Sequence, residues 1–189
     1  YWVPACPGTA GGKDWQAMSY DPQTATLIIP LTQACMEMNG RVVEAKDGGG
    51  GTQADRKFFE MPGSNGNIGH LAAFDVRTMQ QKWSFDQRPE WLTGVMTTDS
   101  GLTFVGDIDR YFHAIDTATG KELWKTRLGT SVQGFPVTFT ANGKQYIGSS
   151  VNVVRRLKEH SHDLKRGNHI NPHLQSAWEK YGSESFSFH

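Results

Sequence analysis

The chain has 189 residues and a mass of 21.0 kDa, which suits one domain or one domain with a small second piece. Nineteen basic residues balance nineteen acidic ones, so the chain as a whole has no field that attracts polyanions. Mean hydropathy is −0.52 and no apolar run approaches the ~20 residues of a spanning helix, so we predict no membrane span. Its 21 glycines and 6 tryptophans favour turn-rich β structure over a helical bundle.

The chain begins at Tyr1 without a targeting segment, and we expect a fragment of a longer protein. Its two cysteines, Cys6 and Cys35, are too few for a disulfide scaffold and lack the close spacing of a zinc site. Their spacing leaves open whether they pair or remain two buried thiols.

Composition changes near residue 150. Residues 1–150 hold 19 of the 21 glycines and carry 13 basic and 15 acidic residues. Residues 151–189 hold 5 of the 7 histidines and carry 6 basic and 4 acidic residues. This shift predicts two units, 1–150 and 151–189.

The earliest elements in chain order are a turn, a strand and a loop. The polar segment 19–24 predicts a turn that leads into a β-branched strand at 27–29. The glycine-rich run from Asp47 to Gly66 predicts a long loop insertion. We do not expect a phosphate-binding loop there, because no helical pattern follows.

An internal repeat follows this loop. Residues 73–83 align with residues 114–124 at an offset of 41, and Ala, Asp, Thr and Trp recur at equal positions. A period of ~40–45 residues with a recurring tryptophan is typical of the four-stranded blades of a propeller. We therefore expect Trp83 and Trp124 to fill the core between neighbouring blades.

The second repeat predicts its own strands. Short β-rich runs at 101–106, 111–115 and 122–127 each fit one strand, with Leu123 and Trp124 on opposite faces of the last. Asp116 to Gly120 predicts a turn closed by the aspartate side chain and ended by a glycine of positive φ.

The last 39 residues have a helical period instead. The spacing of Val151, Val154, Leu157 and Leu164 predicts one helix, with charged, mostly basic residues on its outer side. A second helix is expected from the start signal at Asn171-Pro172 to the stop at Gly182.

A series of short blocks runs in one order through residues 1–150. The blocks are Cys6-Pro-Gly, Gly11-Gly-Lys-Asp-Trp15, Ser19-Tyr-Asp-Pro22, Ile29-Pro30, Cys35-Met36, Trp91-Leu-Thr-Gly-Val95, Gly101-Leu-Thr-Phe-Val-Gly-Asp107, Ala114-Ile-Asp-Thr-Ala-Thr-Gly-Lys-Glu-Leu-Trp124 and Asn142-Gly-Lys-Gln-Tyr-Ile147. Together they resemble the C-terminal quarter of the quinoprotein alcohol dehydrogenases, eight-bladed propellers that use pyrroloquinoline quinone (PQQ). The expected fold is mainly β, a partial β-propeller made of the last blades, with a short α-helical tail.

The resemblance implies a periplasmic enzyme that oxidises primary alcohols to aldehydes with PQQ and a Ca²⁺ or lanthanide ion. A cytochrome c or similar protein would accept the electrons. Carried over, Asp14, Trp15 and Trp91 are the cofactor-binding candidates, against the alternative that both tryptophans are simply buried between strands. Cys6 and Cys35 match a pair that the family joins as a disulfide.

The same resemblance places the catalytic Asp and the metal ligands upstream of Tyr1, so no catalytic or metal-binding residue is expected in this fragment. We therefore expect the chain to be inactive on its own. A folded propeller-like module that only binds partners is a further alternative.

A second set of blocks begins at Asn142. These are Asn142-Gly-Lys-Gln-Tyr-Ile-Gly-Ser-Ser150, Arg155-Arg-Leu-Lys-Glu-His160, Asp163-Leu164, Gly167-Asn-His-Ile-Asn171, Leu174-Gln-Ser-Ala-Trp-Glu-Lys-Tyr-Gly182 and Phe186. They resemble the start of a GIY-YIG nuclease, which implies a DNA-binding remnant of a homing endonuclease as the alternative function.

In that alternative, Tyr146, Arg156 and His169 take the tyrosine, arginine and histidine positions of the nuclease. The first nuclease motif is missing, because Gln133-Gly-Phe135 stands in its place, and the metal-binding glutamate would lie beyond His189. We therefore expect no cleavage and at best weak DNA binding, against the alternative that these residues are a solvated basic helix face with a cluster of histidines. We also expect a chimera, joined within the sequence that both families share around Asn142.

Overall fold

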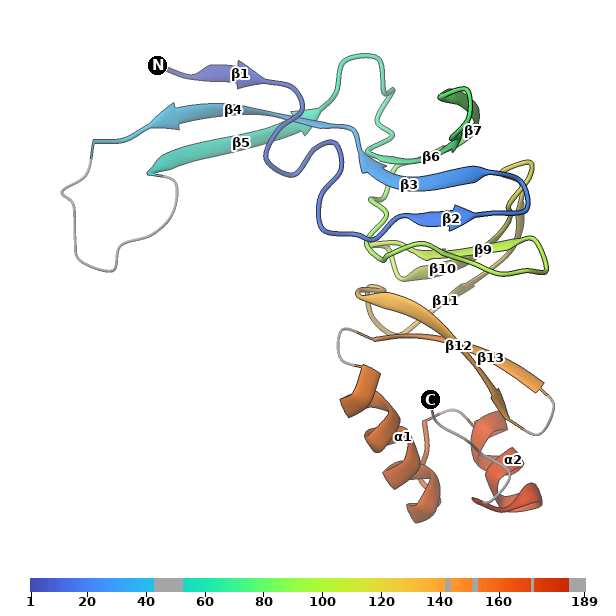
Figure 1. Ribbon diagram of the computed structural model, residues 1–189. Coiled ribbons are helices and arrows are strands. Elements are labelled where there is room, and N and C mark those ends of the chain that lie inside the picture. The colour runs from blue at the N-terminus through green and yellow to red at the C-terminus, as the bar shows by residue number, and fades with distance from the viewer. Residues whose placement is uncertain (43–52, 142–143, 151–152, 171, 184–189) are drawn as a thin grey trace.

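The computed structural model describes residues 1–42, 53–141, 144–150, 153–170 and 172–183 (Figure 1). Two four-stranded antiparallel sheets form its centre. The first sheet has the order β2-β3-β6-β7, with strands β2 (Ser19–Asp21), β3 (Thr26–Thr32), β6 (Gly69–Asp75) and β7 (Gln80–Gln87). The second has the order β11-β10-β9-β8, with strands β8 (Met96–Thr97), β9 (Leu102–Gly106), β10 (Tyr111–Asp116) and β11 (Glu122–Arg127).

Three smaller parts surround these sheets. A three-stranded arm extends to one side (Figure 1). Its strands β4 (Ala34–Gly40) and β5 (Ala54–Glu60) are inserted between β3 and β6, and the N-terminal strand β1 (Val3–Ala5) pairs with β4. A hairpin at the other end contains β12 (Phe135–Ala141) and β13 (Lys144–Ser150). Two helices end the chain, α1 (Val153–Arg166) and α2 (Pro172–Tyr181).

The two central sheets confirm the expected fold, mainly β with neighbouring propeller blades and two short helices. The two sheets also share an irregularity in their strand pairing. Ala73 lies opposite Trp83 and Ala114 lies opposite Trp124, and in both ladders the register shifts directly after the alanine. Each blade therefore carries the same bulge at the same place in the repeat.

The predicted turn of the second repeat is confirmed. The Asp116 carboxylate accepts hydrogen bonds from the backbone N–H of Thr119 at 2.8 Å and from its hydroxyl at 2.7 Å. Gly120 follows with a φ of 74°, a conformation that glycine adopts without steric cost.

The main hydrophobic core lies between the two sheets. Its buried members are Ile28, Leu71, Ala73, Trp91, Val95, Val105 and Ile115, with Trp83 and Phe85 packed against them. Complete burial of one valine, leucine or isoleucine side chain contributes about 1.5–3 kcal/mol to the free energy of unfolding. Both sheets therefore depend on a core that neither could form alone.

Trp83 packs between the blades as predicted. Its indole N–H donates to the backbone carbonyl of Thr117 in the second blade at 3.0 Å. A Cβ at Gly120 would lie 2.6 Å from the Trp83 ring, so the indole rests directly on that glycine.

The prediction for Trp124 is wrong in this chain. Trp124 is 52% exposed, as is Leu123 beside it. The physical reason is positional, because Trp124 lies on the face of the second sheet that no third blade of this kind covers among the described residues.

Two local predictions also need correction. Ser19–Asp21 forms strand β2 before the turn begins, and β5 lies within the predicted loop from Asp47 to Gly66. Most of β5 is exposed on both faces, so its sequence has no need of the alternation of apolar and polar residues that identifies a half-buried strand. Residues 43–52, where the glycine run falls, lie outside the described part of the chain.

Both predicted helices are present, and Gly182 follows α2 with a φ of 78°. Across the described ranges, no helix combines the length and apolar character needed to cross a membrane. The predicted boundary at residue 150 falls between β13 and α1 and remains a prediction.

Candidate functional site

Three segments that are distant in sequence meet at one end of the two sheets. The Gln16 amide donates to the backbone carbonyl of Trp91 at 3.4 Å, and the Val95 N–H donates to the carbonyl of Ala17 at 2.9 Å. The Gly94 N–H donates to the carbonyl of Gly134 at 2.8 Å. Segments 12–17, 91–95 and 132–135 thus form one backbone-linked cluster at the edge of both blades.

Trp91 is the buried centre of this cluster. Only 1% of its surface is exposed, and its indole nitrogen Nε1 is buried without a hydrogen-bond partner among the described residues. Its ring meets Phe85 edge to face at a centroid distance of 5.4 Å, and meets His113 in the same way at 5.0 Å. A buried N–H without an acceptor is costly, so this atom needs an explanation.

A network of titratable side chains contacts Trp91 through the His113 ring. His113 Nε2 lies 3.1 Å from the Asp107 carboxylate, and His113 Nδ1 lies 2.8 Å from the Glu122 carboxylate. The side chains of His113 and Asp107 are 2% and 1% exposed. The imidazole therefore lies between the two carboxyl groups and connects them through its two ring nitrogens.

The Glu122 carboxyl is tuned by opposing effects. Burial raises its pKa, but the hydrogen bond from His113 and the ion pair with Lys125 at 3.1 Å outweigh burial, and the pKa is lowered. Glu122 therefore stays ionised and available to hold His113 at neutral pH.

Asp14 and Trp15 lie in the same cluster but on its surface. The Asp14 side chain is exposed, and its backbone carbonyl accepts from Lys13 Nζ. Trp15 is 47% exposed and meets Phe135 edge to face at 6.2 Å. The structure thus brings the segments of Asp14 and Trp91 together, although no hydrogen bond between the two side chains occurs within the described part of the chain.

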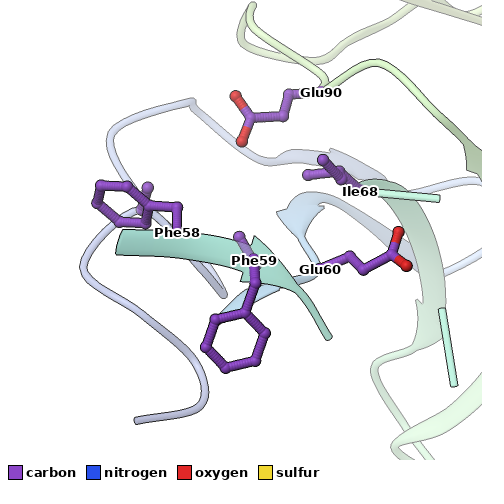
Figure 2. A pocket seen from close by; sticks show the side chains of 7 residues that line it. Phe58, Phe59, Glu60, Ile68 and Glu90 are labelled. Carbon is purple, nitrogen blue, oxygen red and sulfur yellow. The ribbon is translucent and has the colours of Figure 1, made fainter. Parts of the chain in front are cut away.

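A pocket of about 330 Å³ lies between the arm and the segments that flank the first sheet (Figure 2). It is lined by Ala10, Ala34, Phe58, Phe59, Glu60, Ile68 and Glu90. Glu90 faces strand β5 across the hollow (Figure 2), and burial raises the pKa of its carboxyl. The pocket is mostly apolar.

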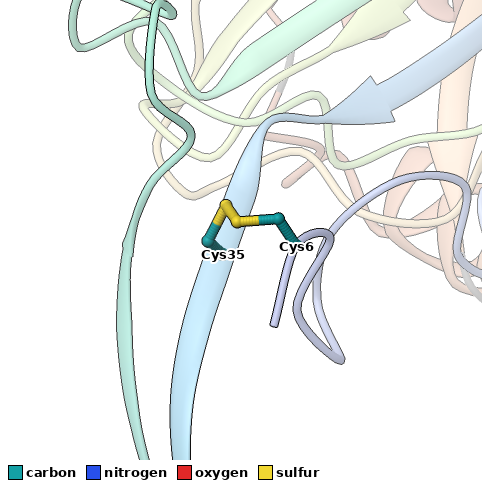
Figure 3. The surroundings of a disulfide bond; sticks show 2 residues. All are labelled: Cys6 and Cys35. Carbon is teal, nitrogen blue, oxygen red and sulfur yellow. A yellow bond between two sulfur atoms is a disulfide. The ribbon is translucent and has the colours of Figure 1, made fainter. Parts of the chain in front are cut away.

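A disulfide joins Cys6 to Cys35 with an S–S distance of 2.01 Å (Figure 3). Near it, the Gly8 N–H donates to the carbonyl of Ala34 at 2.8 Å, and Gly12 exchanges two backbone hydrogen bonds with Thr32. The N-terminal segment is therefore fixed to β3 and β4 before it reaches Asp14.

The residues of the nuclease alternative are only partly described. The side chains of Tyr146 and Arg156 lie outside the described residues, although their backbones belong to β13 and α1. His169 is 7% exposed, and its Nε2 lies 2.5 Å from His160 Nδ1. Across the described residues, no three His, Cys, Asp or Glu side chains gather as a metal site.

Comparison with known proteins identifies the source of the two blades. Residues 88–147 match the PQQ family model for the β-propeller domain of glucose, ethanol and alcohol dehydrogenases. The chain carries a propeller segment of the PQQ-dependent alcohol dehydrogenase family. A lanthanide-dependent methanol dehydrogenase of Methylacidiphilum fumariolicum is 34% identical over 147 residues, which are 75% of this chain and 24% of that protein.

Two further similarities agree with this assignment to PQQ-dependent dehydrogenases. A quinoprotein alcohol dehydrogenase of Pseudomonas putida is 33% identical and covers 79% of this chain and 23% of its own length. The solved structure of a europium-containing methanol dehydrogenase matches 76% of this chain and 25% of its own, with 30% identity and a TM-score of 0.71. The chain thus spans about a quarter of the length of the curated relatives it matches.

The residues present fit the family's cofactor at one atom in particular. The Trp91 Nε1–H is a buried donor that needs an acceptor, and PQQ carries carboxylate and carbonyl oxygens, all of which are acceptors. Asp14 offers only acceptor atoms when ionised, so it suits an N–H of the cofactor and would repel one of its carboxylates.

Sequence reasoning missed Asp107, His113 and Glu122. One signal was present, because β10 alternates Tyr111, His113 and Ile115 on one face with apolar residues on the other. A histidine in that row faces the core, and a buried histidine needs polar partners.

Proposed function

We propose that the chain is part of a periplasmic PQQ-dependent dehydrogenase that oxidises primary alcohols to aldehydes. Trp91 carries the proposal: it lies in the stretch that matches the family's propeller domain, and its buried indole N–H has no acceptor among the residues that the structure describes. Trp91 would donate to an oxygen of the cofactor, and Asp14 would accept from its N–H edge, with Trp15 beside it. When bound, PQQ supplies the quinone that takes up a hydride from the alcohol carbon.

The rest of the site would come from further blades of a longer protein. We place the catalytic Asp and the ligands of a Ca²⁺ or lanthanide ion there, together with the surface for a cytochrome c or similar electron acceptor. This part alone would be inactive, because proton removal from the alcohol and metal binding are assigned to residues outside it. The Cys6–Cys35 disulfide supports an oxidising compartment such as the periplasm.

The test is a fluorescence titration of the chain with PQQ in the presence of Ca²⁺ or a lanthanide. We expect quenching of tryptophan emission in the wild type and in Trp124→Phe, which removes an exposed indole away from the cluster. Trp91→Phe should lose most of the quenching, because it removes the donor and its ring. Equal quenching in Trp91→Phe and wild type, or none in either, would contradict the proposal.

A second candidate function, DNA binding by the C-terminal part, is supported by one observation. Hairpin β12–β13 leads directly toward helix α1, and His160 on that helix contacts the buried His169. The resemblance places Tyr146 on this hairpin, Arg156 on this helix and His169 between α1 and α2.

Its test is a gel shift of the full chain with duplex DNA at about 50 and 200 mM salt, since phosphate contacts weaken steeply with salt. Arg156→Ala should weaken the shift, whereas Arg77→Ala in the first blade should leave it unchanged. No shift at low salt would remove this candidate.

A further inference from the structure

We propose that His113 is a positioning residue, which holds the Trp91 indole in the orientation that presents its N–H to the cofactor. The proposal rests on the function proposed above, in which Trp91 donates to PQQ. It extends that function to a buried network behind the binding surface.

The first step is the contact between the rings. Trp91, Phe85 and His113 form a triangle in which each pair meets edge to face, with centroid distances of 5.4, 5.0 and 6.3 Å. Edge-to-face rings restrict one another, because the positive edge of one is attracted by the negative face of the next. The Trp91 ring therefore turns only if His113 or Phe85 also moves.

The second step is that His113 itself is fixed. Asp107 and Glu122 hold its two nitrogens, at 3.1 and 2.8 Å. Asp107 in turn accepts from the backbone N–H of Tyr111 at 2.8 Å and from the Gln87 amide at 3.3 Å. Gln87 belongs to β7 of the first sheet, so groups from both blades fix the imidazole.

A buried network of titratable groups at this place is unusual. Burying a histidine and a carboxylate costs desolvation, which their mutual contacts at best offset, so apolar residues would serve stability equally well. Asp107 and His113 are nevertheless almost fully buried next to Trp91. Such a network defines one orientation of a side chain, and a donor oriented in advance binds its ligand without ordering cost.

The experiment uses the full chain with ¹⁵N-labelled tryptophan, in which each of the six indole N–H groups gives one NMR signal. Trp91→Phe assigns the Trp91 signal by its disappearance. In His113→Gln, without PQQ, we expect the Trp91 signal to move or broaden while the other five stay in place. Affinity for PQQ should fall about tenfold, the upper range for one edge-to-face ring contact.

His70→Gln is the matched control, because it makes the same chemical change at the His70–Asp86 pair on a more exposed part of the first blade. It should leave the Trp91 signal and the affinity for PQQ unchanged. Glu122→Gln is the second test variant, since it weakens one anchor of His113 at a side chain that is 26% exposed. If His113→Gln does not fold, the same two measurements, the Trp91 signal and the affinity for PQQ, are made on Glu122→Gln.

The outcomes separate the two proposals. If PQQ binds wild type and the His113 and Glu122 variants equally, or if the Trp91 signal is the same in all three, the positioning role is wrong and the proposed function stands. If PQQ moves no Trp91 signal in the wild type, the proposed function fails and this proposal fails with it.

Discussion

The two blades share one repeat, yet their tryptophans have opposite surroundings. Trp83 packs on Gly120 of the next blade, and its indole N–H donates to the backbone carbonyl of Thr117 there. Trp124, at the equivalent position of the second blade, is 52% exposed. The two ladders have the same register and the same bulge, so the difference does not arise within the blade. The turn of the following blade covers the indole. The tryptophan of each repeat is therefore buried only when another blade follows.

The largest effect that tests this comparison is removal of each indole. Trp83→Ala should lower the free energy of unfolding by about 3 kcal/mol, because a large ring leaves the interface between the sheets. Trp124→Ala should change it by about 0.5 kcal/mol or less, since the ring is half exposed. Urea unfolding of both variants measures the difference, and similar losses would mean that the two positions are equivalent after all.

A smaller effect is expected when the docking surface is changed instead of the indole. Gly120→Ala combines a positive φ with a Cβ placed 2.6 Å from the Trp83 ring, and should cost about 2–3 kcal/mol. Gly101→Ala is the control, because Gly101 has a similar φ of 77° but open space around it. It should cost only about 1 kcal/mol. Equal losses by urea unfolding would show that the indole does not press on Gly120.

The equivalent position in the first blade should respond in the opposite direction. Met79 takes the place of Gly120 in the repeat, with a φ of 58° and a side chain that is 74% exposed. Met79→Gly relieves the positive φ without loss of packing and should stabilise the chain by about 0.5–1 kcal/mol. A higher thermal midpoint would show this, and a lower one would contradict it.

The smallest effect concerns the turn aspartates, whose pKa values are both lowered for different reasons. Arg77 lowers the pKa of Asp75 through charged hydrogen bonds, while the hydroxyl and N–H of Thr119 lower that of Asp116. Both turns thus lose stability as pH falls through these lowered values. In 1 M NaCl the pKa of Asp75 should rise toward its usual value and that of Asp116 should hold, because salt screens the exposed ion pair. NMR titration of the carboxyl carbons measures both, and parallel shifts would contradict the assignment.

Sequence patterns predicted the regular parts of this fold closely. The strand at 122–127 and the turn at Asp116 were found because their residues follow local rules of alternation and side-chain capping. Strand β5 was missed because most of it is exposed and its sequence carries adjacent charged residues and adjacent phenylalanines, with no apolar alternation. The exposure of Trp124 was missed because it depends on a neighbouring blade and not on the local sequence.

The site was predictable to a lesser degree. Family resemblance singled out Trp91, but its buried and unpaired N–H follows from three segments that meet only in the folded chain. The two partners of His113 lie far from it in sequence: Asp107 is six residues before it and Glu122 nine residues after it. No helical or strand period connects these positions. Polar networks of this kind are set by the packing of sheets against each other, which a single sequence does not reveal.

The bond between Cys6 and Cys35 has a practical consequence for anyone who prepares this protein. It anchors the strap of residues 6–17 just before that strap reaches the carbonyl of Trp91. Dithiothreitol in a purification buffer would free one end of the strap and loosen its contact with the Trp91 backbone. Samples for cofactor studies should therefore be purified without thiol reagents and checked for free sulfhydryl groups.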